Sequence, residues 1–311
     1  MYNILVTGCG GDIGQSIGKI LKSNLLFKNV VGADMNLDHA GIFIFDTCIQ
    51  LPVCRSTIYL EKLKEAVEKF EIDIILPISE PELRFFAEKR IEKEIFGKVL
   101  ITANIHAMNI GFDKLSTVNF LKESELPYPQ TTIVAKLNEP QLPLILKSRN
   151  GSGSKSIFVV EDAEAFNFYK GRYPEFIAQE LVGSIDEEYT CGLFRDRNNS
   201  VRQLIYRRKL TGGFSGFGTV VQNNDIEKVL YKIADKINLK GSINVQLRLT
   251  NKGPCVFEIN PRFSSTVMFR HIMGFQDLIW SILDRLDQNI PDYTPPENGK
   301  NFYKGFNEYV D

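Results

Sequence analysis

Runs of apolar residues alternate with segments of helical spacing in the first third of the chain. The apolar runs have the length of buried strands and cover residues 2–7, 28–34, 72–77 and 98–103. Between them, apolar residues recur every three or four positions, which predicts helices around residues 13–21, 59–70 and 81–95. Because strands that alternate with helices form parallel sheets, we expect a doubly wound α/β domain here.

The pattern changes after residue 110. Helical spacing is found over residues 111–124, 225–238 and 275–286. Strands are predicted over residues 142–148, 156–162, 175–181, 187–194 and 200–209. Two more strands, 242–250 and 253–260, flank the turn residues Asn251, Lys252 and Gly253, which predicts a hairpin. We therefore expect the rest of the chain to be α+β and largely antiparallel.

Composition limits the classes of function. The chain has 311 residues, 43% of them hydrophobic and 24% charged, as in ordinary soluble proteins. Its formal net charge of −1 gives no basic surface, so no nucleic-acid partner is expected. The five cysteines lack zinc-ribbon spacing and indicate reduced thiols. Because the sequence has neither a membrane-length apolar run nor a signal-peptide pattern, we expect a cytoplasmic protein without a membrane partner. A homodimer is the default expectation.

A glycine-rich turn follows the first predicted strand and precedes the first helix. The spacing of Gly8, Gly11 and Gly14 is typical of a turn that brings backbone N–H groups close to a phosphate. Asp34 ends the second strand, where the ribose-binding acid of a dinucleotide site would lie. However, the sequence lacks the Tyr-x-x-x-Lys pair of short-chain dehydrogenases. A glycine turn that binds no dinucleotide is therefore the favoured interpretation.

Several polar residues are candidate contacts for a substrate. Ligands of α/β sheets bind at the carboxyl ends of the strands, where the glycine turn and the segment after residues 72–77 both lie. Arg207, with its neighbours Arg208 and Lys209, offers cations for a carboxylate or a phosphate. The candidate substrate contacts are Gly10, Gly11, Asp12, Glu80, Glu82, Arg207 and Arg262.

The most specific chemistry lies on the predicted hairpin. Residues two apart on a strand share a face, so Glu258 and Asn260 point into one site. Gln246, on the partner strand, can lie beside them. Carboxylate and amide oxygens suit Mg²⁺, a hard cation that shares its ligand shell with phosphates. Arg262 follows Pro261 and offers a planar cation for a phosphate or an acyl-phosphate transition state.

The hairpin sequence also carries a family resemblance. The string Asn244-Val245-Gln246, followed by Val256-Phe257-Glu258-Ile259-Asn260-Pro261-Arg262-Phe263-Ser264, resembles the ATP-binding domain of the large chain of carbamoyl phosphate synthetase, and the ATP-grasp superfamily generally. The resemblance implies that Gln246, Glu258 and Asn260 coordinate one or two Mg²⁺ ions, with Mn²⁺ as an alternative. It implies that Arg262 contacts phosphate.

The same resemblance implies a domain order. An α/β Rossmann-like domain of the pre-ATP-grasp type is expected over residues 1–110. Two α+β subdomains that form the ATP-grasp fold are expected to follow, a small lid over 111–178 and a C-terminal subdomain over 179–311. Because this chain has room for only one such unit, it is expected to be a stand-alone relative of the synthetase.

Two lysines and a small-residue loop match the phosphate contacts of that superfamily. Lys147, at a predicted strand end, is implied to contact ATP phosphates together with Ser152 and Gly153 of the following loop. Lys114, just before a helix, matches a second phosphate-contacting cation. Arg262 and Lys147 are therefore the expected catalytic residues, because phosphoryl transfer needs charge neutralisation and positioning.

The nucleoside part of ATP has candidate contacts of its own. The segment Gln179, Glu180, Leu181 and Val182 resembles the hinge that holds adenine. Glu188 matches the acid that binds ribose in the superfamily. Extra residues before Glu188 leave its neighbour Glu187 as a rival for the ribose contact.

The resemblance implies an ATP-dependent ligase. Such an enzyme would join a small-molecule carboxylate to an amine, or to a thiol, through an acyl phosphate, and would release ADP and phosphate. ATP and Mg²⁺ would be its cofactors. Two alternatives remain open: a phosphotransferase or carbamate-forming enzyme on the same fold, and an NAD(P)-binding oxidoreductase or sensor that uses Gly8–Gly14.

Overall fold

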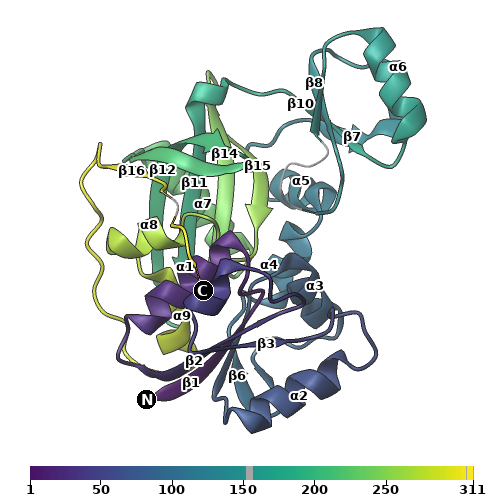
Figure 1. Ribbon diagram of the computed structural model, residues 1–311. Coiled ribbons are helices and arrows are strands. Elements are labelled where there is room, and N and C mark those ends of the chain that lie inside the picture. The colour runs from purple at the N-terminus through teal and green to yellow at the C-terminus, as the bar shows by residue number, and fades with distance from the viewer. Residues whose placement is uncertain (152–156, 306, 311) are drawn as a thin grey trace.

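The computed structural model describes residues 1–151, 157–305 and 307–310, which form three β-sheets (Figure 1). The first sheet has the strand order β3-β2-β1-β4-β6-β5. Its strands are β1 (Tyr2–Thr7), β2 (Phe27–Asp34), β3 (Thr47–Gln50), β4 (Ile74–Pro77), β5 (Glu94–Ile95) and β6 (Lys98–Leu100). All neighbours except β5 and β6 pair in parallel, which confirms the doubly wound sheet expected from the sequence.

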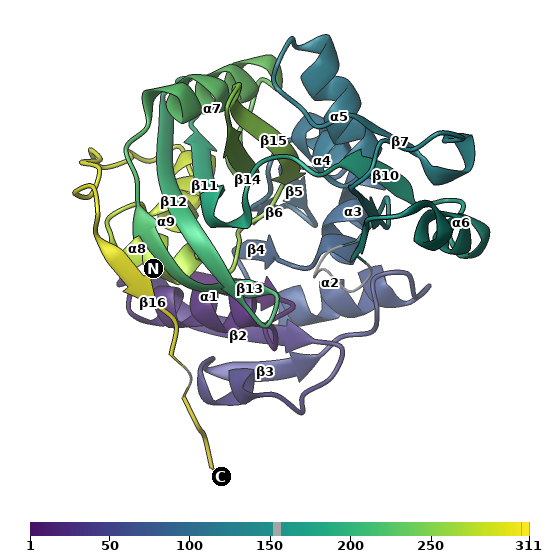
Figure 2. The ribbon, with the colours of Figure 1, turned by 90° about the horizontal axis from the view of Figure 1, so that it is seen from above.

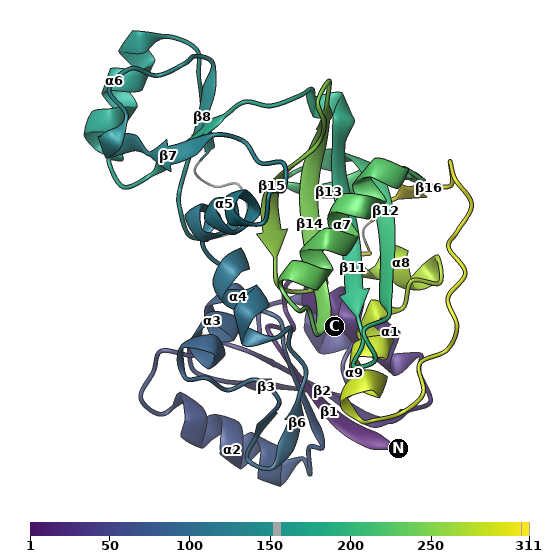
Figure 3. The ribbon, with the colours of Figure 1, turned by 180° about the vertical axis from the view of Figure 1, so that it is seen from behind.

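Helices cover both faces of this first sheet. They are α1 (Asp12–Lys22), α2 (Tyr59–Lys69), α3 (Glu80–Glu88), α8 (Val267–Ile272) and α9 (Asp277–Arg285). On one face, Leu63 of α2 and Phe86 of α3 share a core with Leu5 of β1. On the other face, α1 packs with α8 and α9, as Ile17 and Ile282 illustrate (Figure 3). The last helices of the chain therefore complete the core of its first sheet.

One helix beside this sheet is shorter than the sequence predicted. The helix predicted over residues 81–95 ends at Glu88, because Arg90 adopts a left-handed conformation with φ of 56°. The chain then turns into the short strand β5. The strand β3 and the helix α4 (Ile105–Gly111) are too short to give a clear periodic signal in the sequence.

The second sheet belongs to a small unit that projects away from the rest of the molecule (Figures 1 and 3). Its strand order is β7-β10-β8-β9, and each neighbouring pair of strands is antiparallel. The strands are β7 (Thr131–Ile133), β8 (Leu144–Lys147), β9 (Ile157–Val160) and β10 (Ile177–Glu180). The helix α6 (Ala163–Arg172) covers the sheet, and Phe166 packs there with Leu146 and Ala178. The unit therefore has its own hydrophobic core.

The third sheet is fully antiparallel and carries most of the candidate site. Its order is β15-β14-β11-β12-β13-β16. The strands are β11 (Glu188–Arg195), β12 (Val201–Thr211), β13 (Phe214–Val220), β14 (Gly241–Thr250), β15 (Gly253–Asn260) and β16 (Asn301–Tyr303). The predicted hairpin is thus present as β14 and β15. Figure 2 shows β16, from the end of the chain, along the edge of β13.

The two faces of the third sheet differ in character. Helices α4, α5 (Lys114–Glu123) and α7 (Asn224–Lys236) contribute to the core on one face, where Cys191, Val245 and Ile259 are fully buried. On the other face, α8 and α9 cover only part of the sheet, including Phe194 and Tyr206. The remaining part of that face carries polar residues, and they form the candidate site. Among the described residues, no helix combines the length and apolar character that a membrane crossing requires.

The glycine turn supplies a test of the packing in the first domain. Gly14→Ala should lower the free energy of unfolding by about 1–3 kcal/mol, because a Cβ forced into a packed site displaces its neighbours. That Cβ would lie 2.3 Å from the carbonyl oxygen of Gly8, which is rigid backbone. Gly171→Ala is the matched control, since this helical glycine in α6 has open space at the same position. Urea unfolding measures both variants, and equal stability would contradict the tight turn.

Candidate functional site

The hairpin β14–β15 places three predicted metal ligands together. Gln246 lies directly opposite Glu258, and Asn244 lies directly opposite Asn260. The register shifts at Phe257, which is the extra residue of a bulge. Val256 and Ile259 can therefore both point into the core although they are three residues apart. The bulge leaves Phe257, Glu258 and Asn260 on the opposite, polar face.

Arg262 lies at the end of this hairpin, between the first and third sheets. Its Nη2 donates to Oδ1 of Asn260 over 3.4 Å, and its Nη1 donates to the carbonyl of Phe263 over 3.0 Å. Burial lowers the pKa of Arg262, while the charges of Glu258 and Glu80 act in the opposite direction. The guanidinium thus lies between a carboxylate of the hairpin and a carboxylate of α3.

Glu188 is the centre of a buried ion-pair network. Its Oε1 accepts from Arg208 and its Oε2 from Arg248, each at 2.9 Å to Nη2. The side chains of Glu188 and Arg208 are 8% and 9% exposed, so water screens this pair weakly. Arg208 also donates to Oε1 of Gln246 over 2.9 Å. The network therefore connects the predicted ribose contact with a predicted metal ligand.

Lys147, at the end of β8, faces the same site from the small unit. Its Nζ lies 5.7 Å from the centre of the Phe257 ring, and the residue is 5% exposed. The pKa of Lys147 is lowered to about 8, mainly by burial and also by the positive charges of Lys114 and Arg248. The charges of Glu258 and Glu188 oppose this shift. The pKa of Lys147 therefore depends on charged residues of β11, β14 and β15.

Lys114, the second predicted phosphate contact, lies at the start of α5. Its Nζ donates to the carbonyl of Gly151 over 2.7 Å, and its backbone N–H donates to the carbonyl of Arg149. Arg149 in turn donates from Nε to both oxygens of Asp113, the residue that caps α5. These contacts hold the chain after β8 against α5. The predicted contacts Ser152 and Gly153 lie outside the described residues.

The predicted adenine hinge is the chain between β10 and β11. The side chain of Gln179 is buried and donates to the hydroxyl of Thr131, while Glu180 accepts from the backbone N–H of Gln130. Both side chains thus stabilise the small sheet. Leu181 and Val182 are half-buried, and the carbonyl of Val182 accepts from Arg248 at 3.3 Å. The backbone at 181–182 is therefore the part of the hinge beside the network of Glu188.

The two rival ribose contacts point into different surroundings. Glu187 is partly exposed, accepts from the hydroxyl of Tyr189 over 2.6 Å, and pairs with Arg207 at 3.7 Å. Glu188 is buried and faces Gln246 and Arg248. The structure accordingly places Arg208, rather than the predicted substrate contact Arg207, next to the metal-ligand candidates. Strand alternation links Leu204, Tyr206 and Arg208 on one face, but both faces of β12 are apolar, so the sequence alone does not select Arg208.

The polar groups of the glycine turn are engaged within the first domain. The backbone N–H of Gly10 donates to Asp34 over 2.9 Å, and Asp12 pairs with Lys304 from the end of the chain. Gly11 is exposed at the start of α1. The imidazole of His39 lies so close to Gly10 that a Cβ there would lie 2.3 Å from its ring. The ring of His39 therefore occupies the space beside Gly10.

The two predicted glutamates of α3 also differ. Glu80 pairs with Arg84 at 2.9 Å, and its negative charge raises the pKa of Arg262. Glu82 is 5% exposed and accepts hydrogen bonds from the hydroxyls of Thr7 and Tyr59. Burial raises the pKa of Glu82, which its two hydroxyl donors partly offset. Glu80 therefore lies toward the hairpin, whereas Glu82 is held inside the first domain.

The charges of the site are unbalanced in the described residues. Arg208 and Arg248 pair with Glu188, while Lys147 and Arg262 lie close enough to Glu258 for its charge to affect their pKa values. Lys114 adds a further positive charge near Lys147. Burying unmatched cations is unfavourable unless an anion joins them. The arrangement is thus suited to an anion of several charges, and the hard oxygen atoms of Gln246, Glu258 and Asn260 are suited to a divalent cation beside it.

Comparisons with known proteins agree with this geometry. Residues 112–266 match the family model described as an ATP-grasp domain, and residues 4–101 match that of a PylC-like N-terminal domain. A carbamoyl-phosphate synthase of Methanobrevibacter smithii is 25% identical over 131 residues, which are 40% of this chain and 36% of that protein. The similarity thus spans about a third of the synthase.

Solved structures resemble the chain over nearly its whole length. An L-amino acid ligase from Bacillus licheniformis has a TM-score of 0.71 and 17% identity, and the match covers 92% of this chain and 74% of that one. An ADP complex of N5-carboxyaminoimidazole synthetase from Staphylococcus aureus has a TM-score of 0.74 and 17% identity, covering 94% and 79%. At these identities the likeness establishes a shared fold.

The network of Glu188 can be tested against its exposed neighbour. Glu188→Ala should lower the free energy of unfolding by about 3–5 kcal/mol, because it leaves two buried guanidiniums without their carboxylate. Glu187→Ala removes a partly exposed pair and should cost less than about 1 kcal/mol. Urea unfolding of the two variants provides the comparison. Similar losses in both would show that Glu188 is not the buried counter-ion of Arg208 and Arg248.

The buried amine of Lys147 should make stability depend on pH. The folded protein releases this proton near pH 8, whereas the unfolded chain holds it until about 10.5. The destabilisation by the buried ammonium is therefore fully present below pH 8 and is lost as pH rises. Relative to Lys147→Met, the wild type should gain about 2 kcal/mol between pH 8 and pH 10. Urea unfolding without nucleotide measures this gain, and a pH-independent difference would contradict the lowered pKa.

Proposed function

Because the chain belongs to the ATP-grasp superfamily, we propose that it is an ATP-dependent ligase that joins a carboxylate to an amine, or to a thiol. The observation that carries the proposal is the grouping of Arg208, Arg262 and Lys147 around the hard-oxygen set of the β14–β15 hairpin. A nucleoside triphosphate with a divalent cation supplies both the negative charge and the metal that such a site lacks.

The proposed ATP contacts divide between two parts of the protein. Lys147 contacts the phosphates from the small unit, Lys114 contacts them from the start of α5, and the backbone at 181–182 contacts adenine. Glu188 is the proposed ribose contact, in preference to Glu187, because it lies on the face that carries Gln246. Arg208 and Arg248 hold its carboxylate in place. We therefore assign these two arginines a positioning role.

The donor set of the hairpin fits Mg²⁺. Glu258 offers a carboxylate, while Gln246 and Asn260 offer amide oxygens at adjacent positions of the paired strands. Each amide oxygen already accepts from an arginine and keeps a second lone pair for a metal. When bound, one or two Mg²⁺ ions neutralise phosphate charge, and Mn²⁺ has similar ligand preferences.

The proposed reaction has two steps. An oxygen of the substrate carboxylate attacks the terminal phosphorus of ATP, the bond to ADP breaks, and an acyl phosphate forms. An amine nitrogen then attacks the acyl carbon, phosphate leaves, and the nitrogen loses a proton. Arg262 lies where it can neutralise the transferred phosphoryl group, because it is beside Glu258 and Asn260 at the end of the hairpin.

The carboxylate substrate is proposed to enter between the first and third sheets. Arg262 lines a small cavity there with Pro77 at the end of β4 and Ser242 at the start of β14. Glu80, at the start of α3, lies close enough to Arg262 to raise its pKa and is the proposed contact for a positively charged part of the substrate. Both the carboxylate and the amine are expected to be small molecules.

A coupled assay of ADP release tests the proposal. Amino acids and sugar acids are supplied as carboxylates, with and without an amine partner. A ligase requires both substrates for sustained phosphate release. ATP consumption with a carboxylate alone and a stable phosphorylated product would instead favour the phosphotransferase or carbamate-forming alternative. Tight NADH binding that survives Glu258→Ala would favour the NAD(P)-binding alternative.

Glu258→Gln should abolish Mg²⁺-dependent ATP turnover and leave the fold intact. The substitution keeps the size of the side chain but removes the only carboxylate of the proposed metal set. Glu65→Gln is the control, because Glu65 is exposed on α2 and pairs only with Lys62 in the described structure. Turnover and circular dichroism are measured for both variants. Unchanged turnover in Glu258→Gln would contradict the assignment of the metal site.

A further inference from the structure

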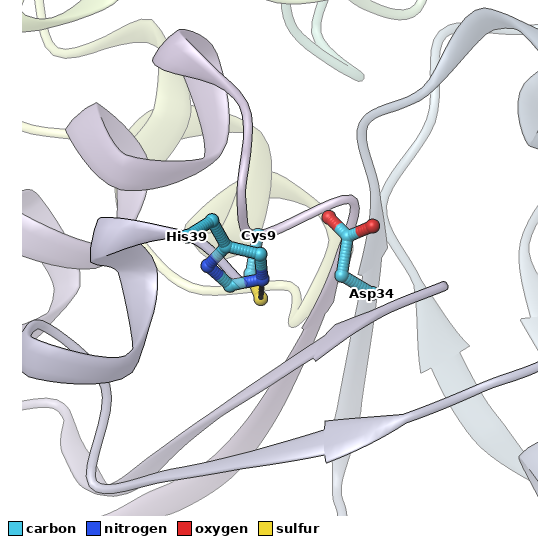
Figure 4. A group of neighbouring side chains, drawn as sticks. All are labelled: Cys9, Asp34 and His39. Carbon is cyan, nitrogen blue, oxygen red and sulfur yellow. Dashed lines mark hydrogen bonds between the residues drawn. The ribbon is translucent and has the colours of Figure 1, made fainter. Parts of the chain in front are cut away.

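A second cluster of metal-binding side chains lies in the first domain, away from the hairpin. Cys9 follows β1, Asp34 ends β2, and His39 precedes the short 3-10 helix η1 (Ala40–Phe43). Figure 4 shows the imidazole of His39 beside the thiol of Cys9, with Asp34 next to them. One ligand atom of each residue lies within 4.8 Å of the other two.

Cys48 of β3 adds a second thiol to this cluster. The thiol of Cys48 lies near that of Cys9. Both lie over Gly32, where a Cβ would come within 2.9 Å of Cys9 Sγ and 3.0 Å of Cys48 Sγ. Glycine at this position of β2 therefore leaves room for the pair of thiols. The thiol of Cys48 thus lies near the group of three ligand atoms from Cys9, Asp34 and His39.

The polar atoms of the cluster are poorly satisfied by the protein itself. His39 Nε2 has only the Cys9 sulfur, at 3.9 Å, and His39 Nδ1 is buried with no hydrogen-bond partner among the described residues. An imidazole in such surroundings loses hydrogen bonds that water would supply. In contrast, Asp34 accepts from the backbone N–H groups of Gly10 and Met35, which hold its carboxylate toward the cluster.

We propose that Cys9, Cys48, His39 and Asp34 form a zinc-binding site. Zn²⁺ is borderline soft, and thiolate, imidazole and carboxylate are its usual ligands in four-coordinate sites. Bond lengths of about 2.3 Å to sulfur and 2.0 Å to nitrogen place neighbouring tetrahedral ligands about 3.5 Å apart. The 3.9 Å between Cys9 Sγ and His39 Nε2 is close to this spacing. In the proposed site Cys48, which lies outside the group of three mutually close ligand atoms, reaches the metal by rotation of its side chain.

Charge favours a cation at this position. Cys9 is fully buried, and the neighbouring Cys48 thiol, its burial and the charge of Asp34 raise its pKa far above the ordinary range of a thiol. Each thiol loses its proton to solvent as its sulfur binds the metal. Two thiolates and one carboxylate around Zn²⁺ give the metal-bound group a net charge of −1. His39 and Asp34 are half-buried, so the ion can enter from that side.

The site has a structural consequence for the first domain. It would join the ends of β1 and β2 to β3 and to the chain before η1. A metal that binds only the folded state stabilises that state by mass action. The proposed zinc site shares no ligand with the proposed Mg²⁺ site at Glu258, whose ligands are all oxygen atoms. Mg²⁺ has little affinity for thiolate and imidazole and should not compete.

Co²⁺ titration of the whole chain tests the proposal. The protein is purified with a reductant, treated with a chelator, and titrated in the presence of excess Mg²⁺. Thiolate-to-cobalt charge-transfer bands are expected, with about one metal per chain, and zinc should displace the cobalt. Elemental analysis after zinc loading and desalting measures the stoichiometry. Zinc should also raise the melting temperature.

Matched variants identify the ligands. Cys48→Ser and His39→Gln should weaken cobalt binding by more than the roughly 100-fold that loss of a supporting residue produces. Cys54→Ser, which removes another half-buried thiol of the first domain, should bind like the wild type. Glu258→Gln should also retain zinc, which separates this site from the proposed nucleotide site.

The wild-type titration decides the matter even if a variant fails to fold. Reduced wild-type protein that shows no charge-transfer band would overturn the proposal. So would equal cobalt affinity in the wild type and the folded Cys48→Ser and His39→Gln variants. A chain isolated with Cys9 and Cys48 joined as a disulfide, and unable to bind Co²⁺ after reduction, would identify the thiols as a redox pair instead.

Discussion

Direct pairing of β14 with β15 is the constraint on which the candidate site depends. Gln246 faces Glu258 only in this register, and a slip of one residue would turn the polar set into the core beneath α7. The bulge at Phe257 lets Val256 and Ile259 remain buried together although they are an odd number of residues apart. The apolar side chains thus fix the register, and the polar side chains take their positions from it.

The electrostatics of the site follow from that geometry. Glu188 on β11 and Arg248 on β14 are direct cross-strand partners, so their ion pair forms as the strands pair. Arg208 joins them from β12 and reaches Gln246. Lys147 comes from a different sheet, and its lowered pKa shows that the nearby carboxylates do not fully compensate its burial. A site that holds unmatched positive charge in the absence of ligand is less stable than it could be, and a polyanion relieves this on binding.

Sequence patterns predicted the parts of the molecule where periodicity and turn chemistry act locally. The parallel sheet, the hairpin and the common face of Glu258 and Asn260 all follow from alternation and from one turn. The choice of Arg208 over Arg207 did not, because both faces of β12 are apolar and only the pairing with β11 decides. The thiol pair of Cys9 and Cys48 was also invisible, since it depends on the parallel pairing of β2 with β3. Cysteine spacing reports local chelation and misses ligands that a sheet brings together.

The glycine turn of the first sheet and the end of the β14–β15 hairpin differ in the groups that they offer to a ligand. The carboxyl ends of β1 and β2 carry a glycine turn, and the ring of His39 occupies the space beside Gly10. The N–H of Gly10 is engaged by Asp34, although the spacing of the glycines resembles a nucleotide motif. Arg262 instead lies where the hairpin meets the first sheet. The negative charges of Glu258 on the hairpin and Glu80 on α3 both raise the pKa of its guanidinium. Substrate selection in the proposed reaction should therefore depend on the α3 side of this junction, because the residues on the hairpin side are proposed to bind phosphate and metal.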